Sequence, residues 1–520
     1  MLRDVLENYL DQLSEREFDA PFLAILRSLG FFDIHPLHGQ FEFGKDFIAK
    51  REENGEVKQY SLQSKAGDLD LRKWRELRNQ LEEIRTTVLS HPNFDQALPR
   101  RTVLVTTGRL IGEAPLSAQQ YGHYVEGKGD GTFETWERDR LAEYIEDSPA
   151  VGLAGQMPDE LLGLIGSIGA GSTTTREIER FSRRWLDNHR PLESSVVECL
   201  VLASRLRERN RLDLAAYATL CLGRSTAARW HADRAEDDFL DLAPRAFVHY
   251  ATLLWERCGA EALDAEELAD SGEFSSFATY PVRCLRIAEI LALLAFWLLR
   301  ESDPRSRDVV NYLLVLAKSN PGLAHPISDN WAISLVLVGA VLGKRDERLT
   351  ERWLREVTKW IADHYDQAPG LAGIDSDETT ELEWLLGRAT NGSSDGARPS
   401  LLATAVLDIE AILEIQAAYD TSRHEFLAVD IHQQVVEFVD NLGQYQRDGD
   451  GVAQSADNTY EDSWNPSDEW KVAAHHRRAR PTALELSGRE WQQLAISLVL
   501  RDRWSLTALR ALALSMTADS

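Results

Sequence analysis

Three polar residues in the first part of the chain have the types and the spacing of a small cation site. Asp46 lies two positions after Gly44, and Gln63 and Lys65 are separated by one residue. Carboxylate and amide oxygens suit Mg²⁺, which takes few ligands from protein. An ammonium group beside the ion would stabilise charge on a phosphate, or position and deprotonate a water. These three residue types together suit a hard-cation site of the kind that assists phosphodiester hydrolysis.

A predicted β-hairpin positions these residues. Residues 46–51 and 57–66 read as strands joined at Asn54-Gly55, the commonest signal for a type I′ turn. Residues two apart on a strand share a face, so Gln63 and Lys65 point the same way. The start of the first strand lies near the end of the second in an antiparallel pair, which brings Asp46 toward both. The alternative is an ordinary hairpin with polar residues on its solvent face.

Residues 1–150 are expected to form an α/β domain around this hairpin. Apolar residues at helical spacing predict a helix over 17–30, and a long polar helix is expected over 71–90. Residues 101–108 contain an apolar run typical of a buried strand, and residues 133–147 predict a strand followed by a helix. This order implies a central mixed sheet flanked by helices.

These elements, taken in order, resemble the PD-(D/E)xK nuclease superfamily, and most nearly its Mrr-like restriction endonuclease branch. The resemblance covers roughly residues 15–145 and rests on "EFDAPFLAILRSLGFFDI", "HGQFEFGKDFIAK", "QYSLQSKAGD" and "VLVTTGRLIGEA". It implies a restriction-endonuclease-like fold with Asp46 and Gln63 as metal ligands and Lys65 as the catalytic lysine. The implied cofactor is Mg²⁺, with Mn²⁺ as a substitute. The branch often has Gln where the superfamily has Glu.

The resemblance also implies an acidic residue of the first helix that assists the metal or the water. Glu17 or Asp19 would fill this place, and the sequence does not choose between them. Glu42 is a further candidate ligand. A neutral ligand such as Gln63 lowers the negative charge of the site and is expected to weaken cation affinity. This leaves open an enzyme whose site is completed by a partner or by DNA.

The character of the sequence changes after residue 150. Residues 151–175 include a stretch of small residues and read as a linker. Helical periodicity dominates residues 176–520, which predicts a large all-α domain that is solenoid-like if its helices stack in pairs, although no fixed repeat is present. We expect this part to sense a trigger, to oligomerise the nuclease, or to bind a protein partner such as a co-encoded ATPase.

Composition limits the classes of function. The 520 residues carry a formal net charge of −27, and residues 1–150 are acidic like the rest. This disfavours a protein that coats nucleic acid nonspecifically, because phosphate binding depends on Lys and Arg. The four cysteines form no CxxC pair, which argues against a zinc site or a disulfide framework. The longest apolar run, residues 290–299, is too short to span a bilayer, so a cytoplasmic location is expected.

Together these features predict a Mg²⁺-dependent endodeoxyribonuclease that hydrolyses double-stranded DNA. By the resemblance, its role is restriction or anti-phage defence in a prokaryote, as a homo-oligomer without membrane association. Two alternatives from other classes stay open. One is a nuclease-like module that has lost catalysis and only binds nucleic acid. The other is a helical scaffold subunit of a defence complex.

Overall fold

A computed structural model describes most of the chain and divides it into two compact units. The first unit comprises Met1–Thr173 with Asn188–Arg205, and the second Thr174–Asp187 with Leu206–Ser520. The described residues are 2–37, 46–86, 93–95, 97–129, 131–155, 157–187, 189–232, 240–261, 276–367, 370–374, 376, 378–388, 398–436, 459–462 and 490–501.

The first unit is built on a mixed five-stranded sheet in the order β1-β2-β3-β4-β5. Strand β2 is antiparallel to both β1 and β3, and β3, β4 and β5 run parallel to one another. The elements are α1 (Leu2–Gln12), α2 (Glu15–Ser28), β1 (Phe32–Pro36), β2 (Phe47–Glu53), β3 (Glu56–Lys65), α3 (Leu71–Thr86), β4 (Arg100–Thr106), α4 (Ala114–Lys128), β5 (Thr132–Trp136), α5 (Arg138–Asp147), η1 (Pro149–Val151) and α6 (Asp159–Ala170). The predicted mixed sheet flanked by helices is confirmed, and α1 and β1 are additions to the predicted order.

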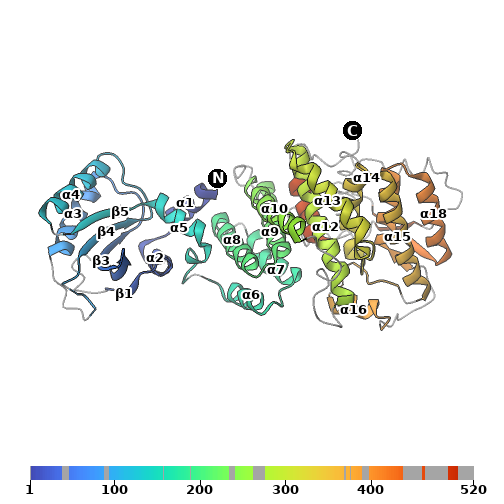
Figure 1. Ribbon diagram of the computed structural model, residues 1–520, viewed down its shortest axis with the longest axis horizontal. Coiled ribbons are helices and arrows are strands. Elements are labelled where there is room, and N and C mark those ends of the chain that lie inside the picture. The colour runs from blue at the N-terminus through green and yellow to red at the C-terminus, as the bar shows by residue number, and fades with distance from the viewer. Residues whose placement is uncertain are drawn as a thin grey trace. The chain divides into compact units, whose positions relative to one another are not determined.

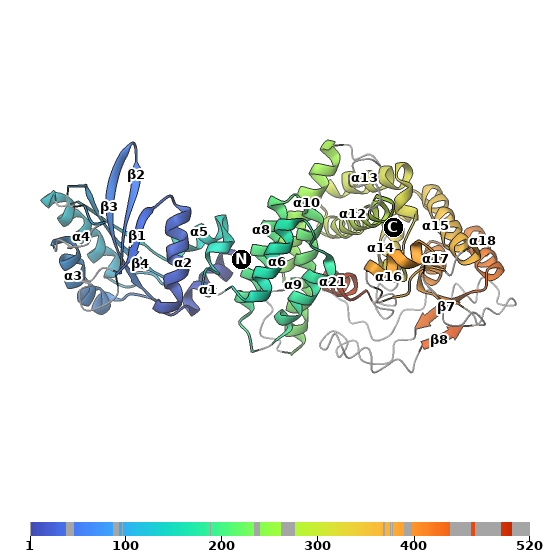
Figure 2. The ribbon, with the colours of Figure 1, turned by 90° about the horizontal axis from the view of Figure 1, so that it is seen from below.

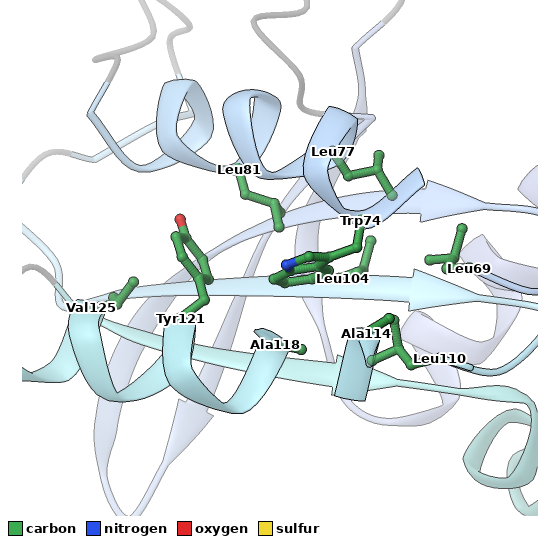
Figure 3. Packing of buried hydrophobic residues seen from close by; sticks show 10 residues of the cluster. All are labelled: Leu69, Trp74, Leu77, Leu81, Leu104, Leu110, Ala114, Ala118, Tyr121 and Val125. Carbon is green, nitrogen blue, oxygen red and sulfur yellow. The ribbon is translucent and has the colours of Figure 1, made fainter. Parts of the chain in front are cut away.

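Helices cover both faces of this sheet (Figures 1 and 2). Helices α3 and α4 lie on one face, where Trp74 packs with Leu104 of β4 and Tyr121 of α4 (Figure 3). Helix α2 covers the other face, where the Phe22 ring meets Phe47 at 5.2 Å between centroids. Strand β4 is therefore apolar on both sides, which explains its continuous apolar run.

The hairpin between β2 and β3 forms as predicted. Glu53 pairs with Glu56, so the turn contains only Asn54 and Gly55. Both turn residues have positive φ, 54° and 81°, as a type I′ turn requires. The tight turn fixes the register of the two strands down to the pair Phe47 and Leu62. Asp46 and Gln63 therefore become neighbours at the open end of the hairpin.

The ends of β3 and β4 are held together by a close backbone approach. The Thr106 hydroxyl donates to the Gly67 carbonyl at 2.7 Å, and the Gly67 amide donates to Thr107 Oγ1 at 2.9 Å. A Cβ placed on Gly108 would lie 2.1 Å from the Gly67 carbonyl carbon. Glycine at position 108 is thus required for the loop after Lys65 to pack on β4.

Gly108→Ala is expected to destabilise the first unit by at least about 2 kcal/mol, because backbone atoms must move to accept the methyl group. Gly166→Ala is the matched control. Gly166 is exposed within α6 with no atom near its Cβ position, so the change should stabilise by about 0.5–1 kcal/mol. Thermal unfolding of the two variants checks both signs, and a Gly108→Ala protein as stable as wild type would contradict the packing described.

The segment expected to be a linker is largely helical, so the expectation is corrected. Helix α6 buries Leu161, Leu164 and Ile168 at helical spacing. It ends at Gly171, whose φ of 75° suits a left-handed cap. The next helix begins after Thr174, whose side chain caps it. The small residues belong to a helix and a tight turn between helices.

The second unit is mainly helical, as predicted. Its elements are α7 (Thr175–Ser182), η2 (Arg183–Leu186), α9 (Leu212–Ala232), α10 (Leu242–Glu261), α12 (Ser276–Arg300), α13 (Arg305–Ser319), η4 (Pro321–Ala324), η5 (Asp329–Trp331), α14 (Ala332–Gly343), α15 (Glu347–Gln367), α16 (Glu378–Leu385), β6 (Arg398–Ser400), α17 (Leu401–Ile412), α18 (Gln416–Ala428), β7 (Ile431–Val436), β8 (Thr459–Asp462) and α21 (Glu490–Leu500). Helix α8 (Leu192–Glu208) has residues in both units. The three short strands form a small sheet that the sequence did not predict.

Two helices of the second unit are buried on all sides. Nearly every residue of α14 and every residue of α17 is buried, and the two helices pack against each other. Figure 1 shows α14 between α12 and α15, which both contact it. This unit therefore has central helices covered by others.

A buried ion cluster joins elements of the second unit. The Glu289 carboxylate accepts two hydrogen bonds of 2.6 Å from Arg501 and one of 2.8 Å from Arg286. The Ser334 hydroxyl donates to it at 2.5 Å. Burial alone would raise the pKa of Glu289, but the two guanidinium groups outweigh it and hold the pKa below its usual range.

Candidate active site

Asp46 and Gln63 meet at the open end of the hairpin, as the register predicts. The Asp46 amide donates to the Leu62 carbonyl at 3.1 Å, which extends the β2–β3 ladder by one bond. Asp46 Oδ2 accepts a hydrogen bond of 3.0 Å from Gln63 Nε2 and one of 2.7 Å from the Ser64 amide. The carboxylate is thus fixed beside the amide group of Gln63. The predicted approach of Asp46 to Gln63 is confirmed.

The amide oxygen of Gln63 is a buried polar atom without a hydrogen bond among the described residues. Gln63 is only 3% exposed, and its Nε2 is already used by Asp46. Gln63 Oε1 accepts no hydrogen bond from any described group. A buried acceptor left unpaired costs about 1–3 kcal/mol, so such an atom points to a missing partner. A cation that takes oxygen ligands suits this position, because the carboxylate of Asp46 lies beside the Gln63 amide group and could also bind the ion.

Lys65 is at the end of β3, and its described ion pair is with Glu15. The distance from Lys65 Nζ to Glu15 Oε1 is 3.3 Å. Glu15 is the first residue of α2, and its side chain is about half exposed, whereas the side chain of Lys65 is 24% exposed. Glu15 is not among the residues that the sequence pattern marked as candidates. The sequence feature that could have pointed to Glu15 is Ser14, because Ser is a preferred N-cap residue and the residue after an N-cap is the first of the helix.

Glu17 has a different local role in the free protein. Its carboxylate accepts from the Ser14 amide at 3.0 Å and from the Ser14 hydroxyl at 2.7 Å, completing a capping box. These hydrogen bonds, with the Ser14 side chain first, lower the pKa of Glu17. Ser14-x-x-Glu17 is itself the sequence signature of this cap. Glu17 is thus engaged in the helix cap, and Glu15 is a carboxylate of the same helix end that pairs with Lys65.

The other two candidate carboxylates are Asp19 and Glu42. Asp19 lies in α2 and is half-buried. Glu42 lies outside the described residues. The group brought together is thus Asp46, Gln63 and Ser64, with Lys65 and Glu15 beside it.

In the part of the chain that the structure describes, no three His, Cys, Asp or Glu side chains gather as a metal site. The proposed ligand pair is one carboxylate and one amide, a set that Mg²⁺ accepts because it keeps several waters. Among the described helices, none is long and apolar enough to cross a membrane. Comparison with protein-family models, with curated proteins and with solved structures finds no match.

Proposed function

We propose that the first unit is a metal-dependent nuclease of the PD-(D/E)xK type that hydrolyses DNA. The observation that carries the proposal is the buried oxygen of Gln63, which accepts no hydrogen bond from the described residues and belongs to the amide group beside the fixed carboxylate of Asp46. The arrangement of the strands supports it as well. A hairpin carries Asp46, Gln63 and Lys65, and parallel strands continue the sheet beyond it.

Asp46 and Gln63 would hold Mg²⁺ in this proposal. The ion, when bound, lowers the pKa of a coordinated water and offsets charge that develops on the phosphate. The Ser64 amide holds the Asp46 carboxylate in place through its 2.7 Å hydrogen bond. The Lys65 ammonium adds positive charge where the phosphate gains negative charge. Glu15, at the N-terminus of α2, orients this ammonium through the ion pair.

Cleavage of supercoiled plasmid tests this proposal. Wild-type protein should produce nicked and linear DNA with Mg²⁺, and none in EDTA. Asp46→Asn is the matched variant, since an asparagine oxygen still accepts the Ser64 amide while the negative charge is lost. We expect this variant to lose nicking with its thermal stability little changed. A wild-type protein that shows no metal-dependent nicking of plasmid would overturn the proposal.

One observation favours a second candidate function, a nucleic-acid-binding module without catalysis. The second ligand is neutral, which weakens the attraction for a divalent cation relative to a pair of carboxylates. Retained DNA binding in the absence of any nicking with Mg²⁺ or Mn²⁺ would support this candidate.

For the second unit we propose a protein-binding or restraining role in prokaryotic defence. Its acidic composition suits contacts with protein better than with a phosphate backbone. A co-encoded ATPase and further copies of the chain are the proposed partners. Co-purification with the product of a neighbouring gene, compared between the full chain and the Lys65→Ala variant, would separate a scaffold role from catalysis.

A further inference from the structure

Three cations lie where the parallel strands of the first unit end. Lys65 is the last residue of β3, Arg109 follows β4 by three residues, and Arg138 follows β5 by two. Parallel strands present their carboxyl ends at one edge of a sheet, and ligands of open α/β sheets bind outside this edge. We call Lys65, Arg109 and Arg138 the cation edge.

Hydrogen bonds to backbone carbonyls show that these residues are close in space. The Thr107 amide donates to the Lys65 carbonyl at 3.1 Å, and Arg138 Nε donates to the Thr107 carbonyl at 2.9 Å. The Arg138 amide donates to the Gly108 carbonyl at 2.9 Å, next to Arg109 in the chain. The cation edge thus forms one continuous rim beside the candidate site.

Each residue of the cation edge is paired with one carboxylate from the first two helices. Arg109 contacts Glu7 at 2.6 Å, and Lys65 contacts Glu15 at 3.3 Å. Arg138 is ion-paired with Asp11. Glu7 and Asp11 lie one turn apart on α1, and Glu15 begins α2, so the three carboxylates come from the two consecutive helices that border the cation edge. We call Glu7, Asp11 and Glu15 the acidic row.

Docking of α1 does not depend on this row. Leu6 and Leu10 are fully buried, and α1 packs on α5, as Figure 1 also shows. The Tyr9 hydroxyl adds a hydrogen bond of 2.7 Å to the Gly152 carbonyl. Exposed ion pairs contribute only about 0–1 kcal/mol each. The acidic row is therefore exchangeable for another anion without loss of the helix.

The two arginines are also held from a second side. Asp139 contacts Arg109 at 2.6 Å, and Asp68 contacts Arg138 at 3.4 Å. These carboxylates keep the guanidinium groups oriented at the rim when the acidic row is released. The Arg109 side chain is 46% exposed, while that of Arg138 is only 12% exposed. Arg109 is therefore the member that an incoming ligand meets first.

We infer that the cation edge binds backbone phosphates of nucleic acid, and that the acidic row occupies it as an internal competitor in the free protein. The ligand class rests on the proposed function, whereas the competition rests on the ion pairs themselves. Guanidinium groups pair with phosphate as they do with carboxylate, through two parallel hydrogen bonds. An acidic protein that acts on a polyanion is in this way kept from binding it until the row is displaced.

The test is fluorescence anisotropy with the full chain and a short labelled DNA duplex, in EDTA and at low salt. The triple variant Glu7→Gln/Asp11→Asn/Glu15→Gln should bind at least about tenfold more tightly than wild type, because Lys65, Arg109 and Arg138 each lose one carboxylate that competes with phosphate. The salt dependence of its binding should steepen. Thermal unfolding should show α1 still docked, with a melting temperature close to that of wild type.

Two further variants keep the test specific. Glu52→Gln/Glu56→Gln/Glu83→Gln removes the same charge at exposed positions outside the acidic row and should leave affinity near the wild-type value. Adding Arg109→Gln to the first triple variant should cancel most of its gain. The inference would be overturned if both triple variants gained the same affinity for DNA, or if the first gained none. A gain in affinity that Arg109→Gln does not reduce would overturn it as well. Because EDTA prevents metal-dependent cleavage, these outcomes are independent of the plasmid assay.

Discussion

Lys65→Met is expected to reduce Mg²⁺-dependent nicking of plasmid DNA by about 10³-fold, the size of effect seen when one charge-stabilising donor is removed from a hydrolytic site. Methionine keeps most of the aliphatic length of lysine but cannot carry charge. The Lys65 ammonium lies 3.3 Å from Glu15 and is partly exposed, so its removal costs little stability. The loss should therefore appear in the cleavage rate and not in the melting temperature.

Lys58→Met is the matched control for this prediction. Lys58 is on the same strand and also forms a carboxylate pair, with Glu53 at 3.0 Å, but it lies at the turn end of the hairpin. Nicking by this variant should remain within about twofold of wild type, which is below the effect of a lost catalytic donor. Equal rates for Lys65→Met and wild type would remove Lys65 from the catalytic step.

Glu289→Gln is expected to destabilise the second unit by about 3–5 kcal/mol, because Arg286 and Arg501 would keep buried positive charge without a counterion. Glu289 is 0% exposed and contacts both guanidinium groups. Denaturation by urea, followed with a probe in each unit, would show which unit has lost stability. The first unit should unfold at an unchanged urea concentration.

The destabilisation caused by Glu289→Gln should depend on pH in a defined direction. The folded-state pKa of Glu289 is lowered, so the carboxylate contributes stability above its unfolded pKa and loses it as pH falls through the folded pKa. The difference in the free energy of unfolding between wild type and the Glu289→Gln variant should thus be largest at neutral pH and decrease only at acidic pH. Glu351→Gln, which breaks an exposed pair of 3.1 Å with Arg355, should cost at most about 1 kcal/mol at any pH. Similar losses from both substitutions would contradict the importance of burial.

Local signals account for the parts of the first unit that the sequence predicted. Asn54-Gly55 fixes the hairpin register, and from that register the approach of Asp46 to Gln63 follows directly. The apolar run of β4 marks a strand buried on both faces. These features depend on residues close in sequence, so periodicity and turn chemistry are sufficient.

The features that the sequence did not predict depend on partners far along the chain, or on segments whose residue types do not indicate one kind of element. Strand β1 has no alternation of buried and exposed residues, because it is at the edge of the sheet. Glu15 reaches Lys65 across 50 residues, and nothing local distinguishes it from Glu17 as a partner. The small residues of α6 look like a linker until Leu161, Leu164 and Ile168 are seen to be buried together.

The contacts of the candidate site and those of the cation edge differ greatly in how far apart the two partners lie along the chain. Asp46 and Gln63 are 17 residues apart within one hairpin, whereas Asp11 and Arg138 are 127 residues apart. Short-range pairs close with little loss of chain entropy and form early, while long-range pairs need the rest of the sheet. During synthesis, the residues proposed to hold the ion can therefore assemble before Arg138 is made. The pairing of the acidic row with the cation edge is completed only after the last parallel strand has been added.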